Sequence, residues 1–118
     1  MVLPSLRRQK DIALLYDKAR RFRFPYLTLL IVPSHDGSTR FLVVASRKVG
    51  KAVERNRARR RARALLSLAS KRLQGQWWIG VICRRELLAA KWSEVGAQVE
   101  RALSQAGALG PDPPALTE

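Results

Sequence analysis

The sequence is short of acidic residues. Of its 118 residues only 9 are Asp or Glu, against 23 Lys and Arg, which leaves a formal net charge of +14 at pH 7. So large an excess of one sign repels itself in a compact chain. It indicates a polyanionic partner whose phosphates replace the missing carboxylates, with an anionic membrane surface as the second option. Solubility alone is the remaining explanation, although smaller net charges already keep small domains soluble.

Cysteine and histidine occur once each, as Cys83 and His35. A single cysteine excludes an internal disulfide and fits a reducing compartment. One Cys and one His are too few for a protein-built zinc site or an oriented Cys/His dyad. We expect Cys83 to be a small buried residue at the end of a strand and His35 to be exposed in a turn. The acidic residues are scattered with no close pair, which disfavours a stand-alone nuclease that binds its own metal.

Long hydrophobic runs are also absent. No segment approaches the ~20 apolar residues of a membrane span, and residues 1–6 lack the apolar core of a signal peptide. The length suits one domain, and the 47% hydrophobic content is ordinary for a globular protein. We therefore expect one cytoplasmic domain over residues 1–106 with no membrane partner. A disordered Pro/Gly-rich tail is expected over residues 107–118.

Hydrophobic periodicity predicts three helices and three strands. The helices are expected at residues 10–21, 56–73 and 93–106, and the strands at residues 26–32, 40–46 and 77–83. The order α-β-β-(β)-α-β-α, in which the bracketed strand is left open, predicts an α+β fold: a two-layer sandwich with a small mixed sheet and packed helices. Ser93 is a candidate N-cap for the last helix. Trp77 and Trp78, being adjacent, are expected to face opposite sides of their strand.

The most unusual segment is residues 46–63, where nine of 18 residues are basic and only Glu54 is acidic. On a helix, several of these arginines stand four residues apart, where like charges cost about 0.2–0.5 kcal/mol per pair. Interspersed alanines form an apolar stripe that can dock on a sheet, so the guanidinium groups point outward and can bind phosphates. The candidate RNA-binding residues are Arg47, Lys48, Lys51, Arg55, Asn56, Arg57, Arg59, Arg60, Arg61 and Arg63.

Several features of this segment have alternative explanations. Asn56 can orient a nucleotide or cap the helix, and the residues favour neither. Gly50, between Lys48 and Lys51, permits a positive φ and a close approach to an anion. A solvated charged surface is the general alternative, but such surfaces normally mix both signs.

The run from Ala45 to Arg63 closely resembles the signature of the bacterial ribonuclease P protein. That signature has a small residue and Ser ending a strand, two basic residues, Gly, Ala-Val, and then Arg-Asn-Arg with further basic positions on a helix. Element order and length resemble that family over residues 6–105. The resemblance implies a left-handed βαβ crossover, where general rules predict a right-handed one.

The resemblance also implies a function. The chain would be the protein subunit of ribonuclease P, an endoribonuclease that matures the 5′ end of tRNA. It would bind the catalytic RNA and the 5′ leader of precursor tRNA, while that RNA, with bound Mg²⁺, cleaves the phosphodiester bond. No catalytic residue or metal ligand is then expected in the protein itself. A ribosomal or other structural RNA-binding protein with a similar α+β module is the alternative.

The resemblance further places the leader in a cleft between the first helix and the sheet. The family usually carries two Phe there, four residues apart, and this chain has Ile12 and Tyr16, with Ser46 as the third expected cleft residue. Tyr16 retains a ring on which a base can stack, whereas Ile12 implies apolar contact. Ordinary core packing is the alternative for both side chains.

Overall fold

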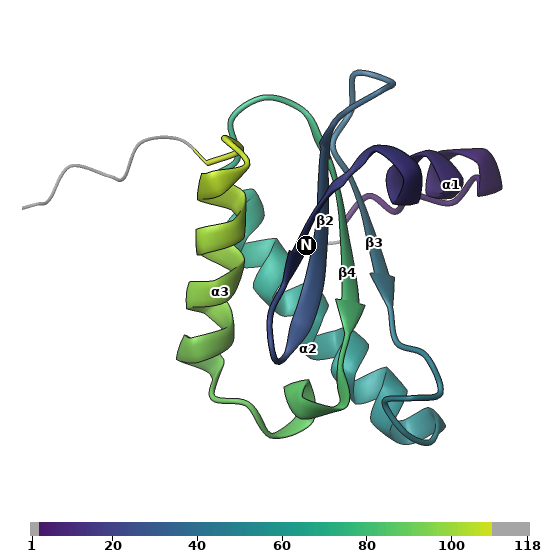
Figure 1. The fold of residues 1–118 in the computed structure, drawn as a ribbon, viewed down its shortest axis with the longest axis vertical. Helices are drawn as coiled ribbons and strands as arrows, with labels where there is room; N and C mark the ends of the chain where they lie inside the picture. The colour runs from purple at the N-terminus through teal and green to yellow at the C-terminus, as the bar shows by residue number, and fades with distance from the viewer. Residues whose placement is uncertain (1–2, 110–118) are drawn as a thin grey trace, which may run out of the picture.

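The computed structural model of the chain describes residues 3–109, which form a four-stranded sheet with helices packed on it (Figure 1). In chain order the elements are α1 (Gln9–Lys18), β1 (Arg20–Arg23), β2 (Leu27–Pro33), β3 (Arg40–Val44), α2 (Ala52–Ser70), β4 (Trp77–Cys83), the short 3₁₀ helix η1 (Arg85–Ala89) and α3 (Trp92–Gln105). The predicted α+β class and mixed sheet are confirmed.

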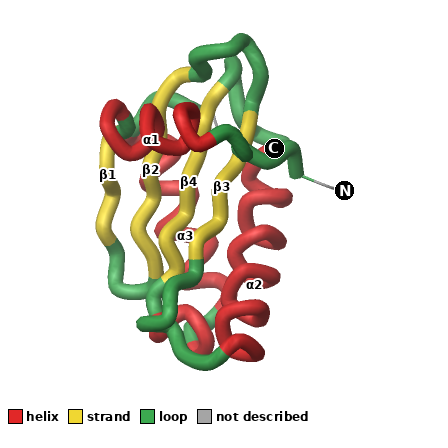
Figure 2. The backbone as a smooth tube through the Cα atoms, turned by 90° about the vertical axis from the view of Figure 1, so that its right-hand side faces the viewer, coloured by secondary structure: helices red, strands yellow, loops and turns green. Residues whose placement is uncertain are grey.

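The strand order in the sheet is β1-β2-β4-β3. β2 pairs antiparallel with both β1 and β4, while β3 and β4 are parallel neighbours joined through α2. In Figure 2 α1 lies in front of the sheet, on the face opposite α2 and α3. Seen from the α2 side with the parallel strands pointing up, the chain passes from β3 leftward to β4. The crossover is therefore left-handed, as the resemblance implied and against the general rule.

Each face of the sheet has its own hydrophobic core. The core under α2 and α3 contains Leu29, Ile31, Ile79 and Val81, and the core under α1 contains Leu15, Leu30, Val32 and Trp78. Burial of β2 and β4 on both faces explains their nearly continuous apolar sequence. Trp77 and Trp78 face opposite sides, as predicted: Trp78 is only 1% exposed in the α1 core, and Trp77 packs half-buried against the other core.

The first helix is shorter than predicted. It ends at Lys18 instead of residue 21, because Arg20–Arg23 pair with β2 as the edge strand β1. Three strands therefore lie between the first two helices, as the predicted order allowed, but the arginine-rich segment itself was not predicted as a strand. The opposite edge strand, β3, is covered by the N-terminal segment: Leu6 N–H donates to the Phe41 carbonyl at 2.7 Å, and Phe41 N–H donates to the Pro4 carbonyl at 2.8 Å.

The second helix begins at Ala52, four residues before the predicted start. The Glu54 carboxylate accepts a hydrogen bond from the Lys51 backbone N–H at 2.9 Å and so caps the helix. Asn56 lies inside the helix, and its interpretation as the N-cap is wrong. Gly50 has φ +147°, and a Cβ there would overlap the Glu54 carboxylate. The anion that Gly50 admits closely is therefore the protein's own Glu54.

The C-terminal boundaries also differ from the prediction. α3 begins at Trp92 with Lys91 at the N-cap position, so Ser93 is not the cap. Residues 107–109, assigned to the tail, belong to the fold. Ala108 is fully buried, its N–H donates to the Leu103 carbonyl at 2.9 Å, and its carbonyl accepts from Gln74 N–H at 2.8 Å. The rest of the expected tail, residues 110–118, lies outside the described residues.

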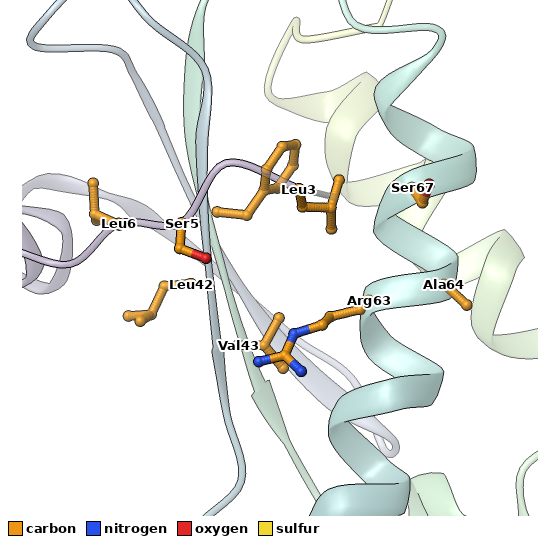
Figure 3. A pocket seen from close by; sticks show the side chains of 9 residues that line it. Leu3, Ser5, Leu6, Leu42, Val43, Arg63, Ala64 and Ser67 are labelled. Atoms are coloured by element: carbon orange, nitrogen blue, oxygen red, sulfur yellow. The ribbon is translucent and has the colours of Figure 1, made fainter. Parts of the chain in front are cut away.

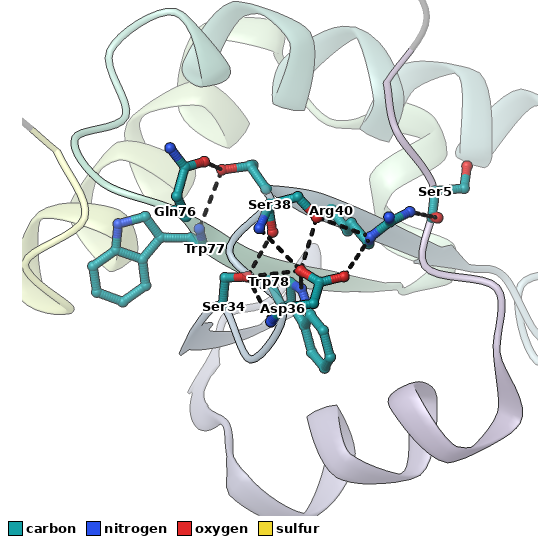
Figure 4. Close-up of polar contacts among 9 residues, drawn as sticks. Ser5, Ser34, Asp36, Ser38, Arg40, Gln76, Trp77 and Trp78 are labelled. Carbon is teal, nitrogen blue, oxygen red and sulfur yellow. Dashed lines mark hydrogen bonds and ion pairs between the residues drawn. The ribbon is translucent and has the colours of Figure 1, made fainter.

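The loop between β2 and β3 is organised around the Asp36 carboxylate (Figure 4). This carboxylate accepts hydrogen bonds from the hydroxyl and N–H of Ser38, from Arg40 Nε at 2.9 Å and from Trp78 Nε1 at 3.3 Å. The bonds from Ser38, above all, hold the pKa of Asp36 well below its usual range. His35 is exposed in the same loop, as expected, with its ring 5.2 Å from that of Trp78.

Candidate nucleic-acid interface

The basic residues of segment 47–63 are not neutralised within the fold. Six of the nine side chains are exposed and the other three are half-buried. Across residues 3–109, none of them has a carboxylate oxygen within 4.0 Å. The cost of crowding these like charges is therefore not offset by internal ion pairs, which leaves them available to an external polyanion.

One side of α2 carries part of this charge. Asn56, Arg59, Arg60 and Arg63 surround the 75% exposed Val53 in a shallow depression, and we call these five residues the α2 cationic face. They share a face because they are spaced three, four and seven residues apart. Asn56 accepts a hydrogen bond from Arg59 Nη1 at 2.7 Å, so it orients a guanidinium.

The α2 cationic face reaches the edge of the sheet through Arg63. Figure 3 shows this side chain extending from α2 toward Val43 on β3, at a pocket of about 660 Å³ that Leu3 and Ser5 also line. Arg59 reaches the same edge, with Nη2 at 3.5 Å from the Ala45 carbonyl. The cations of α2 therefore continue to the β3 edge of the sheet.

Two predicted RNA-binding arginines are engaged within the fold instead. Arg61 donates to the carbonyls of Leu88 at 2.9 Å and Ala90 at 2.6 Å, where η1 ends. Arg55 donates to the Gly50 carbonyl at 3.0 Å. These bonds attach α2 to η1 and to the preceding turn, and they turn both guanidinium groups away from the α2 cationic face.

The turn before α2 presents the remaining predicted cations. Arg47, Lys48 and Lys51 are exposed, and so is Arg57 in the first part of the helix. Ser46 Oγ accepts the Lys48 N–H at 3.2 Å, which fixes the turn. The pKa of Glu54 is lowered first by the bond from Lys51 N–H and then by the positive charges of Arg85, Arg57 and Lys51.

The expected cleft residues lie around a part of the sheet that no helix covers. α1 crosses one end of the sheet face, where the fully buried Leu15 packs over Gly80 (Figure 2). Beyond it the same face continues with Thr28, Ile82 and Val44, which are paired across neighbouring strands. We call these three residues the open sheet face; Ile82 and Val44 are half-buried, and Thr28 is 7% exposed.

Ile12 and Tyr16 border this face from α1, half-buried against the core that contains Leu15. Ser46 is exposed two residues beyond Val44, at the other side. Ile12 and Tyr16 therefore lie together against the α1 core, whereas Ser46 lies in the connection between β3 and α2.

Sequence reasoning missed the arginines of β1. Arg21 Nη2 donates to the Tyr16 carbonyl at 3.2 Å, and its guanidinium lies 5.8 Å from the centre of the Tyr16 ring. The signal was the density of arginine in residues 20–23, which the predicted helix 10–21 partly hid.

The potential metal ligands and the single cysteine are placed as follows. Within residues 3–109, no three His, Cys, Asp or Glu side chains come together as a metal site. Cys83 is 4% exposed, and burial raises the pKa of its thiol to about 11, so it is a neutral core residue as expected. None of the helices in the described part of the chain is both long and apolar enough to cross a membrane.

A helix whose arginines have no carboxylate partner within residues 3–109, beside an open sheet face, defines a basic α+β protein of the RNA-binding class. The Ribonuclease P family profile matches residues 4–107. The chain belongs to the ribonuclease P protein family, whose members are the protein component of this tRNA-maturing endoribonuclease. The ribosomal alternative is not favoured.

Individual relatives agree with this assignment. The chain is 35% identical over 106 residues to the ribonuclease P protein component of Pseudanabaena sp., covering 88% of this chain and 91% of the relative. It is 30% identical to that of Herpetosiphon aurantiacus, over 86% of this chain and 82% of the relative.

Solved structures share the fold. The RNase P protein from Thermotoga maritima aligns with a TM-score of 0.72 at 23% identity, covering 86% of this chain and 96% of that one. The Staphylococcus aureus protein aligns with a TM-score of 0.74 at 19% identity, covering 90% of this chain and 97% of that one.

Proposed function

We propose that this chain binds the catalytic RNA of ribonuclease P and the 5′ leader of precursor tRNA. The α2 cationic face and the turn at residues 46–51 bind RNA phosphates, and the open sheet face receives the single-stranded leader. One observation carries the proposal: the α2 cationic face has no carboxylate partners in residues 3–109 and extends to the β3 edge of the sheet. Arginine suits this role because its planar fork binds phosphate through two hydrogen bonds.

The hydrolysis itself we assign to the RNA subunit and the Mg²⁺ that it binds. In residues 3–109 the ligand-type side chains do not gather into a group of three. Asp36 accepts hydrogen bonds within its loop, and Glu54 accepts the Lys51 N–H at the start of α2. The protein therefore contributes binding and positioning. A cytoplasmic location for the assembled enzyme is part of the same proposal.

Reconstitution with a bacterial ribonuclease P RNA tests the function. The purified chain alone should leave precursor tRNA intact, and adding it to the RNA at low Mg²⁺ should raise the rate of 5′ cleavage. Stimulation should weaken as salt rises, because phosphate contacts release counterions. The function is rejected if no cognate bacterial RNA is stimulated at any salt concentration.

Substitution of Tyr16 tests whether the leader lies on the open sheet face. A base stacked on an aromatic ring contributes about 1–3 kcal/mol, so Tyr16→Ala should weaken binding of a precursor with a leader more than binding of mature tRNA. Tyr16→Phe is the matched control, because it retains the ring and should retain the preference. An equal loss on both RNAs would instead identify Tyr16 as a core residue.

A further inference from the structure

The edge strand β1 carries arginines on both of its sides. Side chains alternate along a strand, and directly paired residues point to the same face. Arg21 pairs with Leu30 and Arg23 with Thr28, so both lie on the α1 face. Arg20 pairs with Ile31, which belongs to the core of the other face. Two neighbouring arginines therefore belong to different surfaces of the protein.

Arg20 has a structural role on its face. Its Nη1 donates to the carbonyl of Gln105, the last residue of α3, at 3.1 Å, and its guanidinium lies 5.1 Å from the centre of the Phe22 ring. A cation at the C-terminal carbonyls of a helix is favourable. Arg20 thus attaches β1 to the end of α3.

Arg21 and Arg23 are placed differently. Both are exposed, and neither has a carboxylate oxygen within 4.0 Å in the described part of the chain. Arg21 is held beside Tyr16 by its bond to the Tyr16 carbonyl and its position near the ring. A guanidinium next to a base-stacking ring can bind the phosphate of a stacked nucleotide or stack on a base itself.

The two sets of cations lie at opposite edges of the sheet. β1 and β3 are the outer strands of the sheet, three strand spacings or about 14 Å apart. Between them lies the open sheet face, which carries no charged side chain. The α2 cationic face borders the β3 edge, and Arg21 and Arg23 lie at the β1 edge. The arrangement fits a single strand that crosses the sheet with its backbone bound at both sides.

We propose that Arg21 and Arg23 bind phosphates of the single-stranded 5′ leader at the β1 edge, so that the leader crosses the open sheet face from α2 to β1. This inference rests on the proposed function, because it extends the path of the leader. It assigns the leader a second cationic border, formed by a strand outside the Ala45–Arg63 signature.

The test compares neighbouring arginines in the reconstituted enzyme. Affinity is measured for precursor tRNAs with leaders of increasing length and for mature tRNA, at several salt concentrations, with Arg21→Ala, Arg23→Ala and the control Arg20→Ala. Each of the first two should weaken binding of long-leader precursors about three- to tenfold and lower the salt slope by about 0.7. Mature tRNA and short leaders that do not reach β1 should be unaffected.

Arg20→Ala should lower the melting temperature and leave the leader preference unchanged. Arg21→Lys keeps the positive charge but changes the packing beside Tyr16. Compared with Arg21→Ala, it should have the wild-type salt slope even if its stability is not that of the wild type. The inference is overturned if Arg21→Ala and Arg23→Ala bind long-leader precursors as well as the wild type, or lose affinity equally for mature tRNA. In either case a leader-specific loss in Tyr16→Ala would leave the proposed function intact, whereas a wild-type protein that never stimulates the RNA would reject that function itself.

Discussion

Arg60 and Arg61 are adjacent in sequence, yet their replacement should have opposite consequences. Arg60 is exposed on the α2 cationic face, whereas Arg61 donates two hydrogen bonds to the carbonyls of Leu88 and Ala90. A hydrogen bond from a charged donor contributes about 1.5–3 kcal/mol when well buried. Arg61 is only half-buried, so about 1 kcal/mol for each bond is the better figure, and Arg61→Ala should cost about 2 kcal/mol of unfolding free energy.

For a chain of this length, that loss lowers the melting temperature by roughly 6–12 °C. Arg61→Ala should leave the salt dependence of RNA binding unchanged, because its guanidinium faces η1. Arg60→Ala should change stability by no more than about 0.5 kcal/mol, since Arg60 is exposed and forms no ion pair within residues 3–109. If Arg60 contacts one phosphate, its loss should lower the slope of log K against log salt by about 0.7–0.9.

Thermal unfolding followed by circular dichroism, and RNA-binding titrations from low to moderate salt, measure the two effects separately. The reasoning is refuted if Arg61→Ala melts like the wild type and lowers the salt slope as much as Arg60→Ala does. That result would mean that Arg61 leaves the η1 carbonyls and binds RNA. Unchanged slope and affinity in Arg60→Ala would remove Arg60 from the contact surface.

Four further predictions concern packing and titration. Gly80→Ala should destabilise the fold by about 1–3 kcal/mol, because the new Cβ would lie 2.9 Å from Cδ2 of the fully buried Leu15. Gly96→Ala, inside α3, should instead stabilise the fold by up to about 1 kcal/mol in thermal melts, because its new Cβ would lie 3.9 Å from the nearest atom, Leu65 Cδ2. Cys83, with its thiol pKa raised to about 11, should resist thiol reagents at pH 8 until denaturant is added, and rapid labelling of the folded protein would contradict its burial. Asp36 has a pKa below its ordinary 3.8, so the unfolded chain takes up the proton first. The stability that ionised Asp36 contributes is complete above about pH 5 and is lost as the pH falls below 4. The difference in melting temperature between wild type and Asp36→Asn should therefore narrow from pH 5 to pH 2. A constant difference would contradict this account.

Much of the fold and of the site could be predicted from local sequence. The predicted bounds of β2 and β4 differ from the observed bounds by at most one residue. These strands are easy to locate because a strand buried on both faces must be apolar throughout. The excess of positive charge and its concentration in residues 46–63 are properties of composition and spacing alone. They indicate a polyanionic partner, and the Ala45–Arg63 signature indicates the family.

Tertiary structure decided which cations are available. The carbonyls that bind Arg61 lie 27 and 29 residues away in the chain, so no local pattern distinguishes this arginine from Arg60. β1 likewise forms because β2 offers it an edge to pair with, although arginine is not among the residues that strands favour. Periodicity reports which side of an element is buried, but the partner of a polar group is chosen by elements that meet only after folding. The sequence by itself therefore determined that this protein binds a polyanion, and the fold determined which arginines remain free to do so.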